Sequence, residues 1–115
     1  MRRPPTEIEK NVVRQVAERL APAVQRQVLD DLSRSEVEPA TPDGARLIFH
    51  ISGYERPPYR GQRLFGVEGE LRDKDGATLF LLLFGDQNGH LLELELVRHA
   101  EGPLIEPDWS ALKLF

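Results

Sequence analysis

An unbroken apolar strand between two turn sequences is the feature that most constrains the fold. Residues 77–84 read Ala-Thr-Leu-Phe-Leu-Leu-Leu-Phe, between Asp-Lys-Asp-Gly (73–76) and Asp-Gln-Asn-Gly (86–89). A strand that is apolar on both sides must be covered on both sides. The sequences before and after it alternate between apolar and polar residues. We therefore expect a three-stranded antiparallel unit, with strands at about 64–73, 77–85 and 90–98.

The turn chemistry predicts the register of these strands. Residues 74–76 suit a three-residue loop that ends in a left-handed glycine, and Asn88-Gly89 suits a two-residue type I′ turn. A slip of one residue would bring glutamates onto the apolar face, so the register is well specified. That face, on which we expect the helices to pack, carries Val67, Leu71, Leu79, Leu81, Leu83, Leu92, Leu94 and Leu96.

The opposite face of the same strands carries an apolar strip between two acidic rows. The strip is Phe80, Leu82 and Phe84; Glu68 and Glu70 flank it on one side, and Glu93 and Glu95 on the other. A contiguous apolar patch of this kind needs a cover. Two covers are open: the C-terminal tail, through Trp109, Leu112 and Leu114, or a second protein or second copy of the chain.

The N-terminal third predicts two helices, at about 7–34. Thr6 and Glu9 form a capping box, and the stripe that follows is Ile8, Val12, Val13, Val16 and Leu20. Pro22 fits the first turn of a second helix better than the interior of one long helix. That second helix carries Val24, Val28, Leu29 and Leu32 on one face.

The remaining segments complete a single domain over residues 1–115. Strands are expected at about 35–40 and 45–52, joined by a β-turn at 41–44, with an exposed loop at 53–63 and a tail at 99–115. The predicted fold class is α+β, with two N-terminal helices packed on one face of a four- to five-stranded antiparallel meander.

Composition excludes several classes of function. The chain has no Cys, its three histidines are scattered, and no catalytic motif is present, so we expect no cofactor, no metal site and no enzymatic activity. Residues 36–115 hold eight Lys or Arg against fourteen Asp or Glu, which argues against nucleic acid as a partner. No apolar run reaches membrane-spanning length and no signal peptide opens the chain. A cytoplasmic protein without membrane contacts is the expectation.

Two surfaces are candidates for binding a protein partner. The loop at 53–63 mixes tyrosine with arginine, which are enriched at binding hot spots, although a solubilising surface loop has the same composition. The glutamate-flanked face could bind a partner, hold a carboxylate pair or a divalent ion, or simply be solvated. The candidate partner-binding residues are Tyr54, Arg56, Tyr59, Arg60, Glu68, Glu70, Phe80, Leu82, Phe84, Glu93 and Glu95.

Three stretches resemble a group of small, uncharacterised bacterial α+β proteins of the toxin-immunity type. They are Arg-Pro-Pro-Thr-Glu-Ile-Glu at 3–9, Asp-Lys-Asp-Gly-Ala at 73–77 and Asp-Gln-Asn-Gly-His-Leu-Leu-Glu-Leu-Glu at 86–95. The resemblance implies a non-catalytic protein-binding module that neutralises a bacterial toxin domain with a basic surface. Two alternatives stay open: a small enzyme or ligand-binding domain that uses the glutamate-flanked face, and a homodimer that joins two apolar strips.

Overall fold

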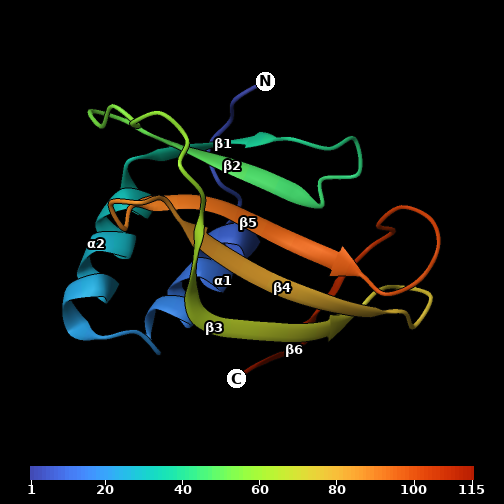
Figure 1. Ribbon diagram of the computed structural model, residues 1–115. Helices are drawn as coiled ribbons and strands as arrows, with labels where there is room; N and C mark the ends of the chain where they lie inside the picture. The colour runs from blue at the N-terminus through green and yellow to red at the C-terminus, as the bar shows by residue number, and fades with distance from the viewer.

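Two helices lie on one face of a six-stranded antiparallel sheet in the computed structural model, which describes residues 1–115 (Figure 1). The elements are α1 (Glu7–Ala17), α2 (Pro22–Ser33), β1 (Ser35–Pro39), β2 (Arg46–Ile51), β3 (Arg63–Arg72), β4 (Thr78–Gly85), β5 (Leu91–Arg98) and β6 (Asp108–Leu114). The strand order is β1-β2-β5-β4-β3-β6. The predicted α+β class is confirmed, but the sheet has six strands rather than four or five.

The sixth strand comes from the C-terminal tail. Leu114 lies opposite Gly69 on β3, and Phe115 exchanges backbone hydrogen bonds with Glu68 (2.9 and 3.0 Å). The side chains of Trp109, Leu112 and Leu114 pack against the hydrophobic core. The tail therefore extends the sheet and seals the face on which the helices pack. The alternative in which it covers the strip of Phe80, Leu82 and Phe84 is wrong.

The strand order also departs from a simple meander. Strands β3, β4 and β5 follow one another, but β2 pairs with β5 rather than with β3. The chain leaves β2 and crosses in front of β5 and β4 before it enters β3 (Figure 1). This connection, residues 52–62, contains Pro57 and Pro58, which cannot supply the N–H groups of a strand. It therefore stays an irregular connection outside the strands of the sheet.

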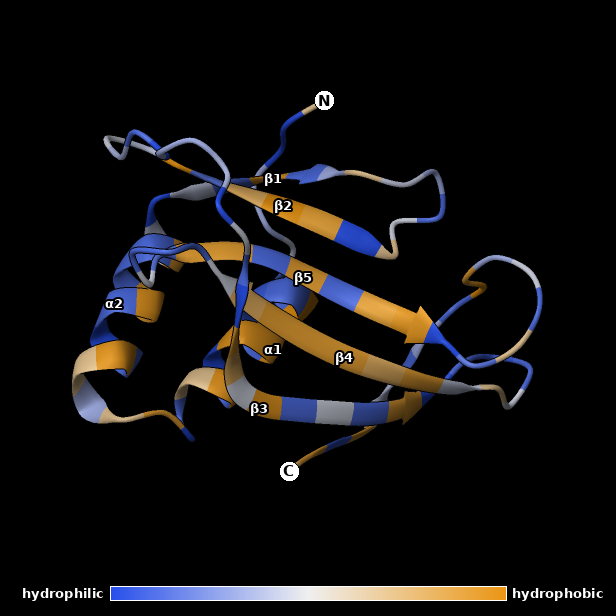
Figure 2. Cartoon of the chain, in the orientation of Figure 1, coloured by the Kyte–Doolittle hydropathy of each residue, from blue (hydrophilic) through white to orange (hydrophobic).

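The predicted register of the three central strands is confirmed over most of their length. Leu71 lies opposite Leu79, Leu81 opposite Leu96, and Leu83 opposite Leu94. Strand β4 is hydrophobic along its length, whereas β3 and β5 alternate (Figure 2). The leucines that alternate along β4 toward the helices are fully buried, whereas Phe80 and Leu82 on the other face are only partly buried, so the expected cover on both faces is complete on the helical face alone.

The second turn differs from the type I′ prediction. Asp86 N–H donates to the carbonyl oxygen of His90 (2.9 Å), so the loop has three residues, and among them Gly89 alone has a positive φ. The carboxylate of Asp86 accepts the N–H groups of Asn88 and His90 (2.9 and 3.0 Å), which holds Asn88 out of the left-handed region that a type I′ turn needs. An extra residue, Leu92, restores the register as a β-bulge.

This bulge changes which leucine faces the core. Leu91 joins the core cluster, whereas Leu92 is buried outside it, contrary to the predicted apolar face. The other predicted members of that face are buried in the core. In the helices, the capping box of Thr6 and Glu9 is present, and Val13, Val16 and Val28 are fully buried.

Two residues of the predicted helical stripes stay at the surface. Ile8 and Val24 are exposed, and each lies in the first turn of its helix. No helix is long and apolar enough to cross a membrane.

Candidate functional site

The predicted acidic and apolar rows do come together on the sheet face away from the helices. Across the three central strands, Glu70 lies opposite Phe80, which lies opposite Val97. In the next row Leu82 lies between Glu68 and Glu95. Side chains at these paired positions point to one face of an antiparallel sheet. The structure therefore places an apolar strip between carboxylates.

One end of this face is closed. Phe84 is 8% exposed and Glu93 is 3% exposed, and the two residues lie opposite each other on β4 and β5. The two carboxylate oxygens of Glu93 accept from Arg46 of β2 at 3.1 and 2.8 Å. Phe84 and Glu93 are therefore unavailable to a partner, and the expectation that Glu93 lies on a solvated surface is wrong.

The other end of the face is open. Phe80 and Leu82 are partly exposed, Val97 is 36% exposed and Glu68 lies in solvent. The ring of His99 packs edge-on against Phe80, with the centroids 4.9 Å apart. We call this surface, made of Glu68, Glu70, Phe80, Leu82, Glu95 and Val97, the open sheet face.

The carboxylates of the open sheet face form no salt bridge within the chain, although Arg46 lies opposite Glu95 and Lys113 lies opposite Glu70 in the sheet. Glu68, Glu70 and Glu95 take part in no salt bridge. Burial raises the pKa of the Glu95 carboxyl, and the neighbouring Glu93 carboxylate raises it further, while Arg46 offsets part of the shift. Ionised Glu95 is thus a carboxylate without a dedicated counter-ion.

The arginines and tyrosines of residues 53–63 separate into two groups. Tyr59 and Arg60 are exposed, as a partner-binding loop requires. Arg56 instead donates to the Asp86 carboxylate (2.8 Å) and to the carbonyl oxygens of Phe49 and Leu91 (2.8 and 3.0 Å). Tyr54 also donates to Asp86, at 2.6 Å. Arg56 and Tyr54 therefore fasten the crossing segment to the sheet.

Asp86 is the anchor of this fastening. Burial raises the pKa of its carboxyl, but the hydrogen bonds from Tyr54 and from the backbone N–H groups of His90 and Asn88, with the charge of Arg56, leave the pKa below its ordinary value. Its oxygens are fully occupied by these donors. Asp86 consequently has a structural role and no free lone pair directed at a ligand.

A second buried carboxylate was not identified from the sequence. Asp31 of α2 is completely buried, and it accepts from the backbone N–H of Leu91 (2.9 Å) and from the Gln27 amide (2.9 Å). The His90 ring, which stacks on Tyr54 at 3.9 Å, lies 3.1 Å from the same carboxylate. The signal was present, because Asp31 follows Val28 by three residues on the apolar face of its helix.

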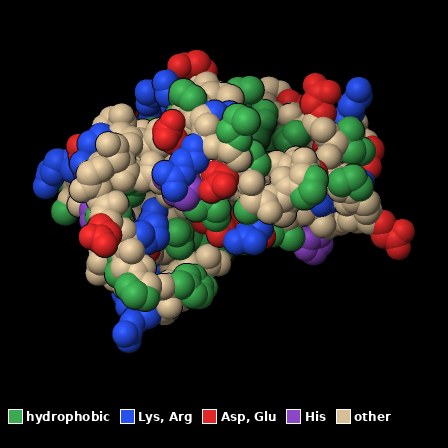
Figure 3. All heavy atoms as spheres, turned by 90° about the horizontal axis from the view of Figure 1, so that it is seen from above, with side chains coloured by type: hydrophobic (Ala, Val, Ile, Leu, Met, Phe, Trp, Pro, Cys, Tyr) green, Lys and Arg blue, Asp and Glu red, His purple; other side chains and the backbone are tan.

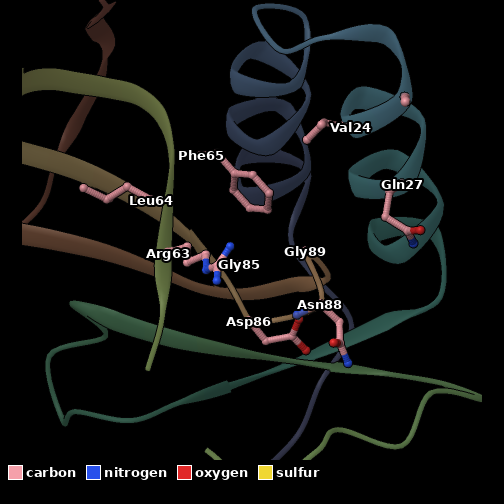
Figure 4. A pocket seen from close by; sticks show the side chains of 10 residues that line it. Val24, Gln27, Arg63, Leu64, Phe65, Gly85, Asp86, Asn88 and Gly89 are labelled. Carbon is pink, nitrogen blue, oxygen red and sulfur yellow. The ribbon is translucent and has the colours of Figure 1, made fainter. Parts of the chain in front are cut away.

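A groove opens beside this polar cluster, between α2 and the adjoining ends of β3 and β4 (Figure 4). Its volume is about 430 Å³. The lining residues are Ala23, Val24, Gln27, Arg63, Leu64, Phe65, Gly85, Asp86, Asn88 and Gly89. None of the candidate residues predicted from the sequence lines it.

Metal and charge patterns add little elsewhere. No cluster of three or more His, Asp or Glu side chains has an arrangement that could hold a metal ion. Seen from above, on the side of β1 and β2, positive and negative side chains are interspersed (Figure 3). The open sheet face, with its carboxylates outside any salt bridge, and the groove, with its exposed apolar and polar lining, are therefore the two candidate binding surfaces.

Comparison with known proteins assigns the chain to a family. The profile of a family described as a domain of unknown function (DUF6984) matches residues 2–108. Because this match covers most of the chain, the chain belongs to that family. No curated protein and no solved structure matches the sequence.

Proposed function

We propose that this member of the DUF6984 family is a non-catalytic protein-binding module that holds a basic surface of a partner protein on its open sheet face. In its most concrete form the proposal is an immunity protein that neutralises a bacterial toxin domain in the cytoplasm. One observation carries the proposal: a partly exposed apolar strip, Phe80 and Leu82, lies between carboxylates that form no salt bridge within the chain.

The layout of this face fits the anatomy of a protein interface. Interfaces combine an apolar centre, depleted in charge, with a polar rim. Here the centre is Phe80 and Leu82, and the rim is Glu68, Glu70 and Glu95. The strands beneath are paired on both sides, so the surface is held rigid before a partner arrives. A preorganised surface loses less conformational entropy on binding.

The state of Glu95 supports a cationic partner. Its pKa is raised by burial and by Glu93, so ionised Glu95 is less stable here than in water. A Lys or Arg side chain brought against it would favour the ionised form. Opposite charges across an interface also raise the association rate and select the partner.

The two alternative functions fit this face less well. A homodimer that joined two open sheet faces would bring the glutamates of both copies together, and like charges across an interface are unfavourable. A catalytic pair of carboxylates could not include Glu93, because both of its oxygens are bound by Arg46. Protein binding is therefore the function we favour.

Site-specific photo-crosslinking in the native host tests the proposal. A benzophenone amino acid at position 82 should capture a protein with a basic surface, whereas the same amino acid at exposed Glu18 of α1 should not capture it. The captured protein is then purified and titrated against the wild-type chain by calorimetry. Glu95→Lys should weaken this binding at least 10-fold, with a smaller loss at high salt.

Glu18→Lys is the matched control, because it makes the same charge reversal on the helical side of the molecule. It should leave the affinity unchanged. Equal capture from positions 82 and 18, or an affinity that Glu95→Lys does not alter, would show that the open sheet face is not the binding surface.

A further inference from the structure

The groove between α2 and β3 is separate from the open sheet face, and the two surfaces share no residue. Its lining includes two exposed aliphatic residues, Val24 of α2 (38% exposed) and Leu64 of β3 (46% exposed). Figure 4 shows Phe65 projecting from β3 toward the helices, on the side where Val24 lies, whereas the neighbouring Leu64 points to the other side of the strand. The apolar part of the groove is therefore formed by Val24 and Phe65.

A backbone irregularity creates this groove. The register between β3 and β4 shifts between Leu64 and Glu68, and Gly66 within the shift has a φ of 88°. An L-residue with a side chain rarely adopts that conformation. Gly85 opposite has no room for a side chain, because a Cβ there would lie 2.8 Å from the Phe65 ring. The Phe65 ring of β3 therefore packs closely on the backbone of Gly85 in β4.

Some polar groups of the groove are hydrogen-bonded within the chain, and others are free to bind a ligand. Asp86 is fully hydrogen-bonded within the chain, as described above. Arg63 takes part in no salt bridge or side-chain hydrogen bond. The Gln27 amide donates to Asp31 and the Asn88 amide lies 3.4 Å from Tyr54 Oη, but no donor of the chain reaches their carbonyl oxygens. The groove offers one cation and two acceptors.

We propose that this groove binds the C-terminal residue of a partner peptide that ends in an aliphatic side chain. Arg63 would pair with the terminal carboxylate, which matches the planar fork of a guanidinium. The peptide N–H would donate to Gln27 or Asn88. The aliphatic side chain would lie against Val24 and Phe65 and lose its contact with water.

Each part of this ligand corresponds to a group that the groove leaves unsatisfied. A fatty acid would supply the carboxylate and the apolar body but no donor for Gln27 or Asn88. The groove is also open to solvent, which leaves a path for the peptide chain that precedes the terminal residue. A peptide terminus meets all of these conditions.

The proposal is independent of the function assigned to the open sheet face, because the two sites share no residue. Peptide binding at the groove can occur without partner binding through Leu82 and Glu95, and partner binding can occur without peptide binding. Variants at the two sites therefore show which of the two proposals is wrong.

Amide chemical shifts of the full chain, labelled with ¹⁵N, provide the test. The peptide Gly-Gly-Leu should give saturable shifts confined to residues 23–27, 63–66 and 85–90. Its C-terminal amide, which lacks the carboxylate, should bind at least 10-fold more weakly. Arg63→Gln should weaken Gly-Gly-Leu by the same factor and should leave the affinity for the amide unchanged.

Arg60→Gln is the matched control, since Arg60 is an exposed arginine of the same segment and lies outside the groove. It should bind Gly-Gly-Leu as the wild type does. Both arginines are exposed, so both variants should keep the wild-type spectrum away from the substitution. Equal affinity for acid and amide, full affinity in Arg63→Gln, or binding of N-acetyl-leucine without binding of Gly-Gly-Leu would each overturn the proposal.

Discussion

Replacing Asp31 with alanine should remove the polar link between α2 and the sheet. The Asp31 carboxylate is the acceptor for the backbone N–H of Leu91, and both residues are completely buried. In Asp31→Ala this N–H would be left without a partner. An unsatisfied buried polar group costs about 1–3 kcal/mol. The other donors to this carboxylate, Gln27 and His90, are partly exposed and can turn to water, so they add little.

Urea denaturation measures this loss directly. With a typical dependence on urea of about 1–3 kcal/mol per molar, the midpoint should fall by roughly 1 M in Asp31→Ala. Asp31→Asn keeps one carbonyl oxygen for Leu91 and should recover part of the loss. Asp30→Ala is the adjacent control: it removes an exposed pair with Arg34, which contributes about 0–1 kcal/mol.

Local hydrogen exchange gives a second readout. The Leu91 amide should exchange faster in Asp31→Ala by more than the global loss of stability explains, because its acceptor has gone. If Asp31→Ala and Asp30→Ala have the same midpoint within about 0.5 kcal/mol, and Leu91 stays protected, the buried carboxylate does not hold the helix to the sheet.

Three further predictions concern the core, the tail and pH. Leu81→Ala should cost about 2–5 kcal/mol, whereas Leu82→Ala on the open sheet face should cost clearly less, and denaturation of both variants compares them. Removal of residues 108–115 should lower the melting temperature, because it strips β6 and its apolar side chains from the core, and an unchanged melting temperature would contradict this packing. Glu95→Gln should raise stability at neutral pH. The pKa of Glu95 is higher in the folded protein than in the unfolded chain, so the stability that protonated Glu95 contributes in acid is lost as the pH rises through the folded-state pKa. The gain should vanish in acid, and a gain that persists there would point to another cause.

The sequence predicts the central sheet because turn chemistry and alternation agree there. Lys74-Asp75-Gly76 is specific enough to give the β3–β4 register, and glutamates at alternate positions make any slip unfavourable. The Asn88-Gly89 turn was misassigned because a neighbouring carboxylate, Asp86, redirects the local backbone. The error was harmless to most of the register, since the bulge at Leu92 compensates for it.

Long-range placement was the part that sequence could not supply. A tail rich in apolar residues can cover either face of a sheet, and only the pairing of β6 with β3 decides between them. The groove was equally invisible, because it depends on a register shift within β3 and on residues from three elements. The burial of Asp31 could have been predicted, because this acidic residue lies on the apolar face of its helix.

The crossing of residues 52–62 over the sheet implies an order of assembly during folding. Strands β3, β4 and β5 are joined by short loops and can pair locally, whereas β2 meets β5 only across a long sequence separation. Non-local pairing is slow because the entropy of closing the intervening loop must be lost first. The three-stranded unit is thus the expected folding nucleus, and the β1–β2 hairpin docks onto it afterwards. Substitutions in the β3–β4 turn should consequently slow folding, and those in residues 52–62 should mainly speed unfolding.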